Sequence, residues 1–240
     1  LSFSTQILLR NVCIFKPDII IDSSTYPLTI FGCSKIARKY NAKLIFEVHD
    51  LWPLTPVELG GYPRFHPFII FLEIAERYAY KNSYKVISIL PDTKTYMVKH
   101  GMHGEKFIYI PNGINLSEWE RLDQLTTEYD EFFNELRIGG KFIIGYTGNL
   151  GLANAVDSLL KAAVLLRDSS EIHFVIVGDG ILEAELKSFA ASNNLKNVTF
   201  LPSILKKYIP KILSLMDCVY IGAPQKKLYR FGASPNKLLE

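Results

Sequence analysis

Residues 142–163 read FIIGYTGNLGLANAVDSLLKAA, and this stretch decides the fold of the second half of the chain. Its apolar start, Phe142–Ile144, predicts a buried strand, and the small residues of Gly145–Gly151 predict a loop. Apolar residues then recur at a helical spacing from Val156 to Val164. A strand, a glycine loop and a helix in this order direct free backbone N–H groups toward one point, where the helix dipole adds about half a positive charge. The stretch therefore predicts a site for a phosphate group.

The composition is that of a folded, soluble protein. The 240 residues are 48% hydrophobic and 21% charged, and this length suits one large domain or two of ordinary size. The net charge is +3, with Lys and Arg scattered, so nothing indicates a nucleic-acid surface. Three cysteines lie far apart, and their odd count favours a reduced, cytoplasmic setting over a disulfide framework. The apolar run Phe68–Leu72 is far too short to span a bilayer.

Both ends of the sequence suggest a part of a longer protein. The chain has no start methionine and begins inside an expected helix, and it stops within about two turns of another helix. We therefore expect both terminal regions of the fold to be incomplete.

Short apolar strands alternate with amphipathic helices along the whole chain. This alternation predicts parallel sheets with helices on both faces, that is, a doubly wound α/β fold. The polar segment 112–138 is expected to be a linker with one short helix near 129–137, so we predict a first domain of residues 1–138, linker included, and a second of residues 139–240. The expected strands are 19–22, 43–48, 85–89, 106–110, 142–146, 172–177, 198–201 and 218–221. The main expected helices are 27–40, 68–81, 91–101, 153–166, 181–192 and 206–216, and residues 51–67 are expected to form a long loop.

Ligands of open parallel sheets bind beyond the carboxyl ends of the strands. If the two domains face each other, the loops at those ends line a cleft between them. The loops in question are Ser23–Thr25, His49–Asp50, Gly145–Gly151, Gly178–Gly180 and Pro202–Ser203.

Six stretches resemble one known family when they are taken together and in order. They are EVHDLWP at 47–53, IPNGI at 110–114, GYTGNLG at 145–151, VGDG at 177–180, VTFL at 198–201 and FGASPNKLLE at 231–240. The chain resembles the retaining glycosyltransferases of family 4, and within them the bacterial enzymes that build O-antigen, capsule or colanic acid. The resemblance covers nearly the whole chain.

This resemblance implies a GT-B fold, in which two Rossmann-like domains face a cleft, here with both domains incomplete. It also implies an activity, which is transfer of an N-acetylated amino sugar from a UDP-sugar to a lipid-linked saccharide. Such an enzyme would work in the cytoplasm or at the cytoplasmic face of the inner membrane. The helix containing Phe68–Leu72, with Arg64 and Lys81 nearby, could touch that membrane, although its apolar residues also suit a protein core.

The resemblance assigns donor binding to the glycine loop. Gly148, Asn149 and Gly151 would face the donor diphosphate, although the same residues suit an ordinary strand-to-helix turn. In much of the family an Arg and a Lys belong to this loop, and here Asn149 and Asn154 take their places. The positive charge is therefore expected from Lys237.

Other parts of the resemblance concern the remainder of the donor site. Ser234 would join Lys237 at the start of a helix, where a phosphate is favoured, although Lys237 could also simply face solvent. Glu240 matches the glutamate that binds the ribose, and Gly232 stands where the family has a first glutamate. Leu201 would place backbone groups against a uracil base unless it is only a buried strand end.

Two further assignments complete the expected site. Gly178 and Asp179 would lie beside the nucleotide, although Asp179 also suits a plain turn. His49 would be the catalytic residue, facing the donor sugar, positioning it and stabilising charge, whereas a lone His at a strand end can also be structural. No Asp-x-Asp motif occurs, which favours a metal-independent reaction without a cofactor other than the donor substrate. Asp50 is the nearest carboxylate and a poor candidate nucleophile, so front-face displacement is favoured over double displacement.

Two alternatives remain open at this stage. A nucleotide-sugar 2-epimerase shares the fold, but it requires several carboxylates around the sugar. A catalytically inactive subunit that only binds nucleotide would explain the absent Arg, Lys and first glutamate.

Overall fold

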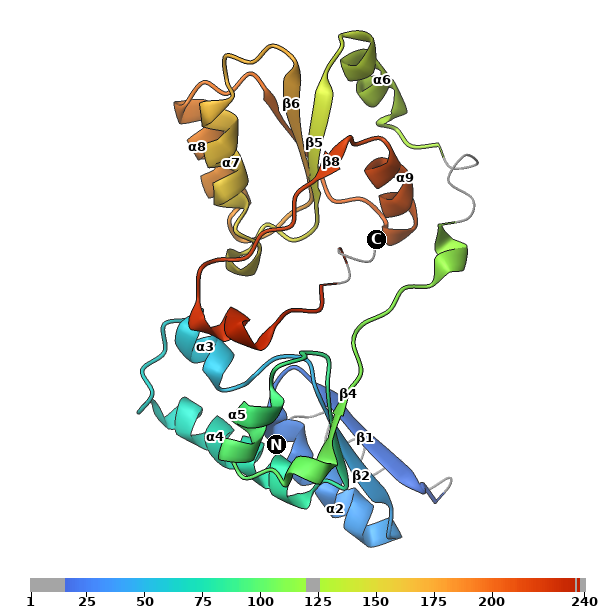
Figure 1. Ribbon diagram of the computed structural model, residues 1–240, viewed down its shortest axis with the longest axis vertical. Coiled ribbons are helices and arrows are strands. Elements are labelled where there is room, and N and C mark those ends of the chain that lie inside the picture. The colour runs from blue at the N-terminus through green and yellow to red at the C-terminus, as the bar shows by residue number, and fades with distance from the viewer. Residues whose placement is uncertain (1–15, 120–125, 236, 238–240) are drawn as a thin grey trace. The chain divides into compact units, whose positions relative to one another are not determined.

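The computed structural model describes residues 16–119, 126–235 and 237, and it divides into two α/β units (Figure 1). Unit 1 comprises the described residues up to Asn112 together with Gln225–Pro235. Unit 2 comprises the described residues of Gly113–Pro224 and Lys237. Within the described residues each unit contains one four-stranded sheet, and every pair of neighbouring strands is parallel. The expected doubly wound α/β class is confirmed.

Unit 1 has the strand order β1-β2-β3-β4, which follows the chain. Its strands are β1 (Ile19–Ser24), β2 (Lys43–Val48), β3 (Lys85–Ser88) and β4 (Phe107–Tyr109). Its helices are η2 (Pro27–Thr29), α2 (Ile30–Tyr40), α3 (Leu54–Glu58), α4 (Pro67–Asn82), α5 (Lys94–Lys99), η3 (Gly104–Lys106) and η8 (Lys227–Phe231). The expected long loop 51–67 thus contains a short helix, α3.

Local signals explain where the two long helices of unit 1 begin and end. Helix α4 starts with Pro67, whose missing N–H suits a first turn, and the Phe68 N–H donates to Nδ1 of His66 at 3.2 Å. Helix α2 stops at Asn41, which adopts a left-handed conformation with φ 54°. These ends place the following strands, so β2 begins at Lys43 as the sequence predicts.

The core of unit 1 includes residues from a distant part of the chain. Leu228 and Phe231 of η8 are buried in the same cluster as Phe46, Val86 and Met97. Hydrogen bonds to other residues of unit 1, among them two donated by or accepted from its backbone near η8, hold this returning segment in place. The Asp92 N–H donates to the Phe231 carbonyl at 3.1 Å, and the Leu228 N–H donates to Oε2 of Glu58 at 2.6 Å.

Unit 2 has the strand order β7-β6-β5-β8, so the direction of winding reverses at β5. Its strands are β5 (Phe142–Thr147), β6 (Ile172–Val177), β7 (Val198–Leu201) and β8 (Cys218–Val219). Its helices are η4 (Leu116–Glu118), α6 (Asp130–Ile138), η6 (Leu152–Asn154), α7 (Val156–Leu165), α8 (Glu183–Ser192), η7 (Lys206–Tyr208) and α9 (Ile209–Ser214). Sequential strands β5, β6 and β7 lie side by side, and β8 returns to the other side of β5.

Alternating side chains of β5 and β6 build two cores in unit 2, one on each face of the sheet. Tyr146, Phe174 and Ile176 pack with residues of α7 and α8, and Ile143 and Val175 pack with residues of α6 and α9. Figure 1 shows these two helix pairs on opposite faces of the sheet. The sheet is therefore covered on both sides, as the continuous apolar strands predict.

The division into units differs from the predicted boundary between residues 138 and 139. Helix α6 belongs with unit 2 because Phe133 is fully buried against Ile143 and Ile212. The segment Gln225–Pro235 belongs with unit 1, although the predicted second domain includes it. Both differences come from the packing of a few apolar side chains on distant elements, which local sequence patterns do not reveal.

The helix after the glycine loop also begins later than predicted. The sequence suggests a start at Ala153, but η6 occupies Leu152–Asn154 and Ala155 is left-handed at φ 45°, so α7 begins at Val156. Strand β8 is likewise shorter than the predicted 218–221. Among the described residues, no helix combines the length and apolar character needed to cross a membrane.

The carboxyl group of Glu76 is one of two that are buried among the described residues of unit 1, the other being that of Asp22. Glu76 on α4 is 1% exposed, and its Oε1 accepts a hydrogen bond from the Tyr80 hydroxyl at 3.1 Å. Burial raises the pKa of Glu76 to about 8, although hydrogen bonds from Tyr80 and Tyr96 oppose the shift. Its Oε2 lacks a hydrogen-bond partner in the described structure. The folded protein therefore holds a proton that the unfolded chain releases.

We predict that Glu76 makes the free energy of unfolding fall as the pH rises from about 4.5 toward about 8. In this window the unfolded state has lost the proton and the folded state retains it, so the slope approaches ~1.4 kcal/mol per pH unit. Glu76→Gln should remove this contribution, whereas the exposed Glu105→Gln control should keep it. Urea unfolding at several pH values measures the slopes, and equal slopes for wild type and Glu76→Gln would contradict the prediction.

Candidate functional site

The candidate site in unit 2 lies at the point where its strand order reverses. In open parallel sheets such a point leaves a crevice at the carboxyl ends of the strands, where ligands bind. Here the reversal falls at β5, because β6 and β8 flank that strand on its two sides. The sequence predicts a loop at Gly145–Gly151, but β5 extends to Thr147, so only Gly148–Gly151 lies beyond the strand, and we call this segment the glycine loop.

Two glycine loops touch through their backbones at this edge of the sheet. Gly148 and Gly178 have φ values of 134° and 144°, in the region that glycine alone adopts easily. A Cβ added to Gly178 would lie 1.9 Å from the carbonyl oxygen of Gly148, and no side chain fits there. The Gly148 N–H donates to the Val177 carbonyl at 2.9 Å, and the Gly178 N–H donates to the Leu201 carbonyl at 3.1 Å. These bonds tie the ends of β5, β6 and β7 together.

The loop offers fewer backbone donors than its sequence suggests. The N–H groups of Gly148 and Leu150 already donate to carbonyls, the second to that of Asp179 at 2.6 Å. Asn149 and Gly151 are the loop residues whose N–H groups have no acceptor in the described part of the chain. Because α7 begins at Val156, its dipole acts several residues beyond the loop.

Lys237 lies directly against this loop. Its Nζ donates a hydrogen bond to the Tyr146 hydroxyl at 2.9 Å and stands 4.2 Å from the centre of the Tyr146 ring. A Cβ on Gly148 would come within 2.5 Å of the same nitrogen, so the glycine makes room for the ammonium group. Burial raises the pKa of Tyr146 to about 12, which keeps its hydroxyl protonated at neutral pH. The structure thus brings the predicted cation to the predicted loop, and its role toward a ligand stays a prediction.

Polar contacts fix the shape of the loop around Asn149. The carbonyl of Asn149 accepts hydrogen bonds from the Tyr146 hydroxyl at 2.7 Å and from Nδ2 of Asn154 at 2.9 Å. Asn154, at the place where the resemblance leads us to expect a lysine, therefore has a structural contact here. The side chain of Asn149 is exposed, as is that of Asp179 in the neighbouring loop.

Ser234 and Lys237 are assigned to different units. The Oγ of Ser234 accepts a hydrogen bond from the Asn112 N–H at 3.0 Å, and its carbonyl accepts one from Nδ2 of Asn112 at 2.6 Å. These contacts place Ser234 with unit 1, whereas Lys237 contacts Tyr146 in unit 2. Glu240 lies outside the described residues.

His49 belongs to a polar cluster at the carboxyl edge of the unit 1 sheet. Its Nε2 lies 3.2 Å from Oγ of Ser23 and 3.4 Å from Oε2 of Glu47. A hydrogen bond from Ser23 lowers the pKa of Glu47, so this carboxylate is ionised at neutral pH. Because Oε2 of the Glu47 carboxylate lies 3.4 Å from Nε2, the tautomer with its proton on Nε2 is favoured, and the Ser23 hydroxyl oxygen then accepts from it. The Nδ1 edge of the ring is then the acceptor side.

Glu47 is a functional candidate that sequence reasoning did not single out, and Ser23 is expected from the sequence only as part of the cleft-lining loop Ser23–Thr25. Two signals could have found them. Glu47 lies in β2 and His49 directly follows its last residue, Val48, so their spacing of two residues favours side chains on the same face. Ser23 is the register partner of Glu47 across the parallel pair β1–β2.

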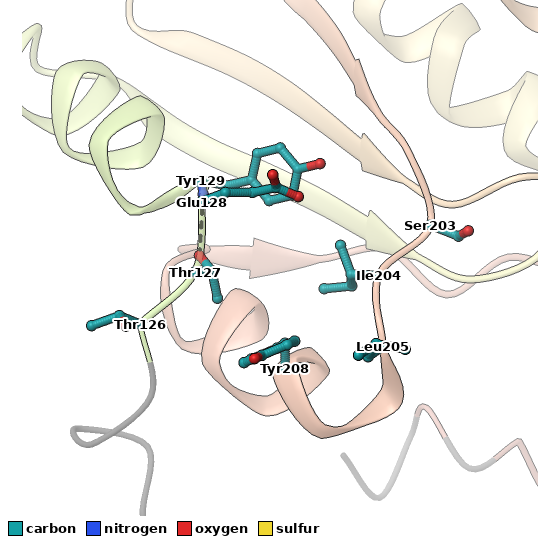
Figure 2. A pocket seen from close by; sticks show the side chains of 8 residues that line it. All are labelled: Thr126, Thr127, Glu128, Tyr129, Ser203, Ile204, Leu205 and Tyr208. Atoms are coloured by element: carbon teal, nitrogen blue, oxygen red, sulfur yellow. Dashed lines mark hydrogen bonds between the residues drawn. The ribbon is translucent and has the colours of Figure 1, made fainter.

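Unit 2 also contains a pocket of about 360 Å³ beyond the end of β7 (Figure 2). Hydroxyl and apolar side chains surround it, including those of Thr127, Tyr129, Ser203 and Tyr208, and Glu128 is the one charged group among its described lining residues. It shares Ser203 with a predicted cleft-lining loop but contains none of the predicted donor-binding residues, and a carboxylate without a cation among its described lining residues does not favour a diphosphate. Among the described residues, no group of three or more His, Cys, Asp or Glu side chains is placed to hold a metal ion.

Family models match the two halves of the chain. Residues 2–118 match the model described as Glycosyltransferase Family 4, and residues 128–224 match the model described as Glycosyl transferases group 1. One parallel α/β unit lies under each match, so the chain has the two-unit architecture of the GT-B fold, and each of its halves is similar to a family of glycosyltransferases.

A curated relative is similar to nearly the whole chain. The chain is 26% identical over 227 residues to WcaI of Escherichia coli, named as a colanic acid biosynthesis glycosyl transferase. The match covers 93% of this chain and 54% of the relative, so the chain spans about half the length of that protein.

Several solved structures share the fold. The structure of Anabaena HepE in complex with UDP and glucose has a TM-score of 0.69 and is 17% identical in sequence. This match covers 91% of this chain and 56% of the HepE chain. Sucrose-phosphate synthase from Thermosynechococcus elongatus has a TM-score of 0.68 and is 16% identical in sequence. This match covers 92% of this chain and 54% of the synthase chain. WaaG, a glycosyltransferase involved in lipopolysaccharide biosynthesis, has a TM-score of 0.60 and is 14% identical in sequence. This match covers 86% of this chain and 61% of the WaaG chain. At these identities the likeness concerns the fold alone.

We predict that Gly178→Ala destabilises unit 2 by about 1–3 kcal/mol or more, because its methyl group would collide with the Gly148 carbonyl in a strained backbone conformation. Gly113→Ala is the control, since a Cβ there meets nothing within 4 Å. Its effect should stay within about 0.5 kcal/mol. Urea unfolding compares the two, and equal midpoints would refute the proposed close contact of the loops.

Proposed function

We propose that this chain is the greater part of the catalytic region of a retaining glycosyltransferase that uses a UDP-sugar and a lipid-linked saccharide acceptor. The observation that carries the proposal is the Lys237 ammonium group held against the Gly148 loop at the reversal point of the unit 2 sheet. A cation and unpaired N–H groups at this place suit the diphosphate of a nucleotide-sugar. HepE, which shares the fold, was solved with UDP and glucose.

The proposed chemistry depends on stabilising a leaving diphosphate. Negative charge grows on that group as the bond to the sugar breaks, and Lys237 with the Asn149 and Gly151 N–H groups would stabilise it. We propose that these groups act without a metal ion. Front-face displacement fits this arrangement, since the departing diphosphate can take the proton from the acceptor hydroxyl.

His49 is proposed to act on the sugar. The proton on Nε2 of His49 is shared between Ser23 and Glu47, so the orientation of the ring is fixed. The side chain of His49 is nevertheless 41% exposed. The Nδ1 edge can then accept a hydrogen bond from a sugar hydroxyl, and the nearby Glu47 carboxylate stabilises positive charge on the ring. Asp50 is not assigned a nucleophilic role.

The acceptor is proposed from the curated relative. WcaI is named for colanic acid biosynthesis, a surface polysaccharide, which supports a saccharide acceptor. We propose that the acceptor is lipid-linked, that the donor sugar is an N-acetylated amino sugar, and that the enzyme works at the cytoplasmic face of the inner membrane. A 2-epimerase and an inactive nucleotide-binding subunit are the competing functions.

The test of this function is a transfer assay with UDP-, GDP- and dTDP-sugars and a polyprenyl-diphosphate saccharide. Transfer from a UDP-sugar with the anomeric configuration retained is the expected result, and His49→Ala should lower turnover while leaving UDP affinity nearly unchanged. Formation of UDP-ManNAc from UDP-GlcNAc alone would favour the epimerase. UDP binding without transfer to any acceptor would favour the inactive subunit.

We predict that Lys237→Ala weakens UDP binding by about 1–3 kcal/mol, the scale of a charge-assisted hydrogen bond. Lys161→Ala removes a lysine of the same unit that pairs with Asp157 on the surface of α7, and it should leave the affinity unchanged. Isothermal titration calorimetry with UDP measures both variants. An unchanged affinity for Lys237→Ala would remove the lysine from the donor site.

A further inference from the structure

A second concave surface lies entirely within unit 1 and contains none of the predicted site residues. It is a pocket of about 340 Å³ between α3, α4, α5 and η8, which we call the basic pocket. Its charged lining residues are Arg64, Lys99, Lys227 and Arg230 on the positive side and Glu58 and Glu73 on the negative side. Four cations against two carboxylates leave an excess of two positive charges.

The two carboxylates do not neutralise these cations directly. Oε2 of Glu58 already accepts the Leu228 N–H at 2.6 Å. The ion pairs found within the described residues join other side chains, and none includes a cation of the basic pocket. A concave surface with an excess of cations attracts an anion.

Buried anchors position the two cations that η8 supplies. Leu228 and Phe231 alternate with Lys227 and Arg230 and are only 8% and 7% exposed. The guanidinium group of Arg230 lies 4.7 Å from the centre of the Phe231 ring. Lys227 and Arg230 are therefore held at the pocket by the core of unit 1, although their own side chains are exposed.

An apolar surface adjoins the basic pocket along α4. Ile70, Glu73 and Ile74 are spaced i, i+3 and i+4, so they share one face of the helix. Glu73 lines the pocket, while Ile70 and Ile74 are 44% and 53% exposed. Phe65, the neighbour of Arg64, is 90% exposed. An anion site bordered by exposed apolar side chains suits an amphiphile with a phosphate head.

We propose that the basic pocket binds the diphosphate of the lipid-linked acceptor, with the isoprenoid chain lying over Ile70 and Ile74. This inference rests on the proposed function. A bilayer phospholipid shares the chemistry, but its diester phosphate carries one charge, whereas a diphosphate diester carries one on each phosphate. The excess of two positive charges matches the diphosphate.

The head-group test compares Lys227→Gln/Arg230→Gln with Lys35→Gln/Lys94→Gln. Both double variants lose two positive charges from unit 1, and the second pair lies outside the basic pocket. Calorimetry with farnesyl diphosphate should show affinity reduced about tenfold or more in the first variant and nearly unchanged in the second. An equal loss of affinity in both double variants would show that net charge alone causes the effect, and it would overturn the proposal.

The chain test uses Ile70→Ser/Ile74→Ser. This variant should bind farnesyl diphosphate more weakly and inorganic diphosphate as well as wild type does, because only the apolar contact is lost. Loss of binding to phosphatidylglycerol vesicles in Lys227→Gln/Arg230→Gln, with farnesyl diphosphate binding intact, would assign the cations to the bilayer and overturn the proposal.

Kinetics separates this inference from the proposed function. In the transfer assay, Lys227→Gln/Arg230→Gln should raise KM for the lipid-linked acceptor about tenfold and leave KM for the UDP-sugar unchanged. Transfer with an unchanged acceptor KM would overturn the acceptor site while the function stands. Absence of transfer in wild type, with farnesyl diphosphate binding still dependent on Lys227 and Arg230, would overturn the function and retain the pocket as a diphosphate site.

Discussion

The organisation of unit 2 depends on one backbone contact, between the Gly148 carbonyl and the Cα of Gly178. Because neither residue carries a side chain, the loops after β5 and β6 can interlock, and β7 joins them through the Leu201 carbonyl. The carboxyl edge of the sheet thus becomes a continuous hydrogen-bonded surface. Lys237 and Tyr146 lie on this surface, so the cation occupies space that any larger residue at position 148 would fill.

Within each unit, hydrogen bonds from neighbouring side chains fix the orientation of one polar group of the proposed site. In unit 1, Ser23 and Glu47 fix the orientation and the proton of His49. In unit 2, the Tyr146 hydroxyl accepts from Lys237 and donates to the Asn149 carbonyl, so one side chain links the cation to the loop. Preorganised groups of this kind stabilise developing charge without having to rearrange during a reaction.

The sequence predicts the strands well because buried parallel strands are continuous apolar runs. The bounds of Lys43–Val48, Ile172–Val177 and Val198–Leu201 coincide with the predictions. The turn before α7 is missed because the left-handed Ala155 leaves no compositional signal. The family resemblance leads us to expect Lys237 at the same donor site as Gly148. That the N–H groups of Gly148 and Leu150 already donate to carbonyls is seen only in the structure, because it depends on contacts between loops.

The return of Gln225–Pro235 to unit 1 has a consequence for the connectivity of the molecule. The part of unit 2 up to Pro224 is in effect an insertion within unit 1, and the second family match ends at residue 224, where the chain crosses back. A gene fragment that stops at Asn112 would therefore lack Leu228 and Phe231 and leave a cavity in the core they fill. Isolating unit 1 as an independent domain requires joining Asn112 to Gln225 with a designed linker, so that the excised polypeptide retains its full hydrophobic interior.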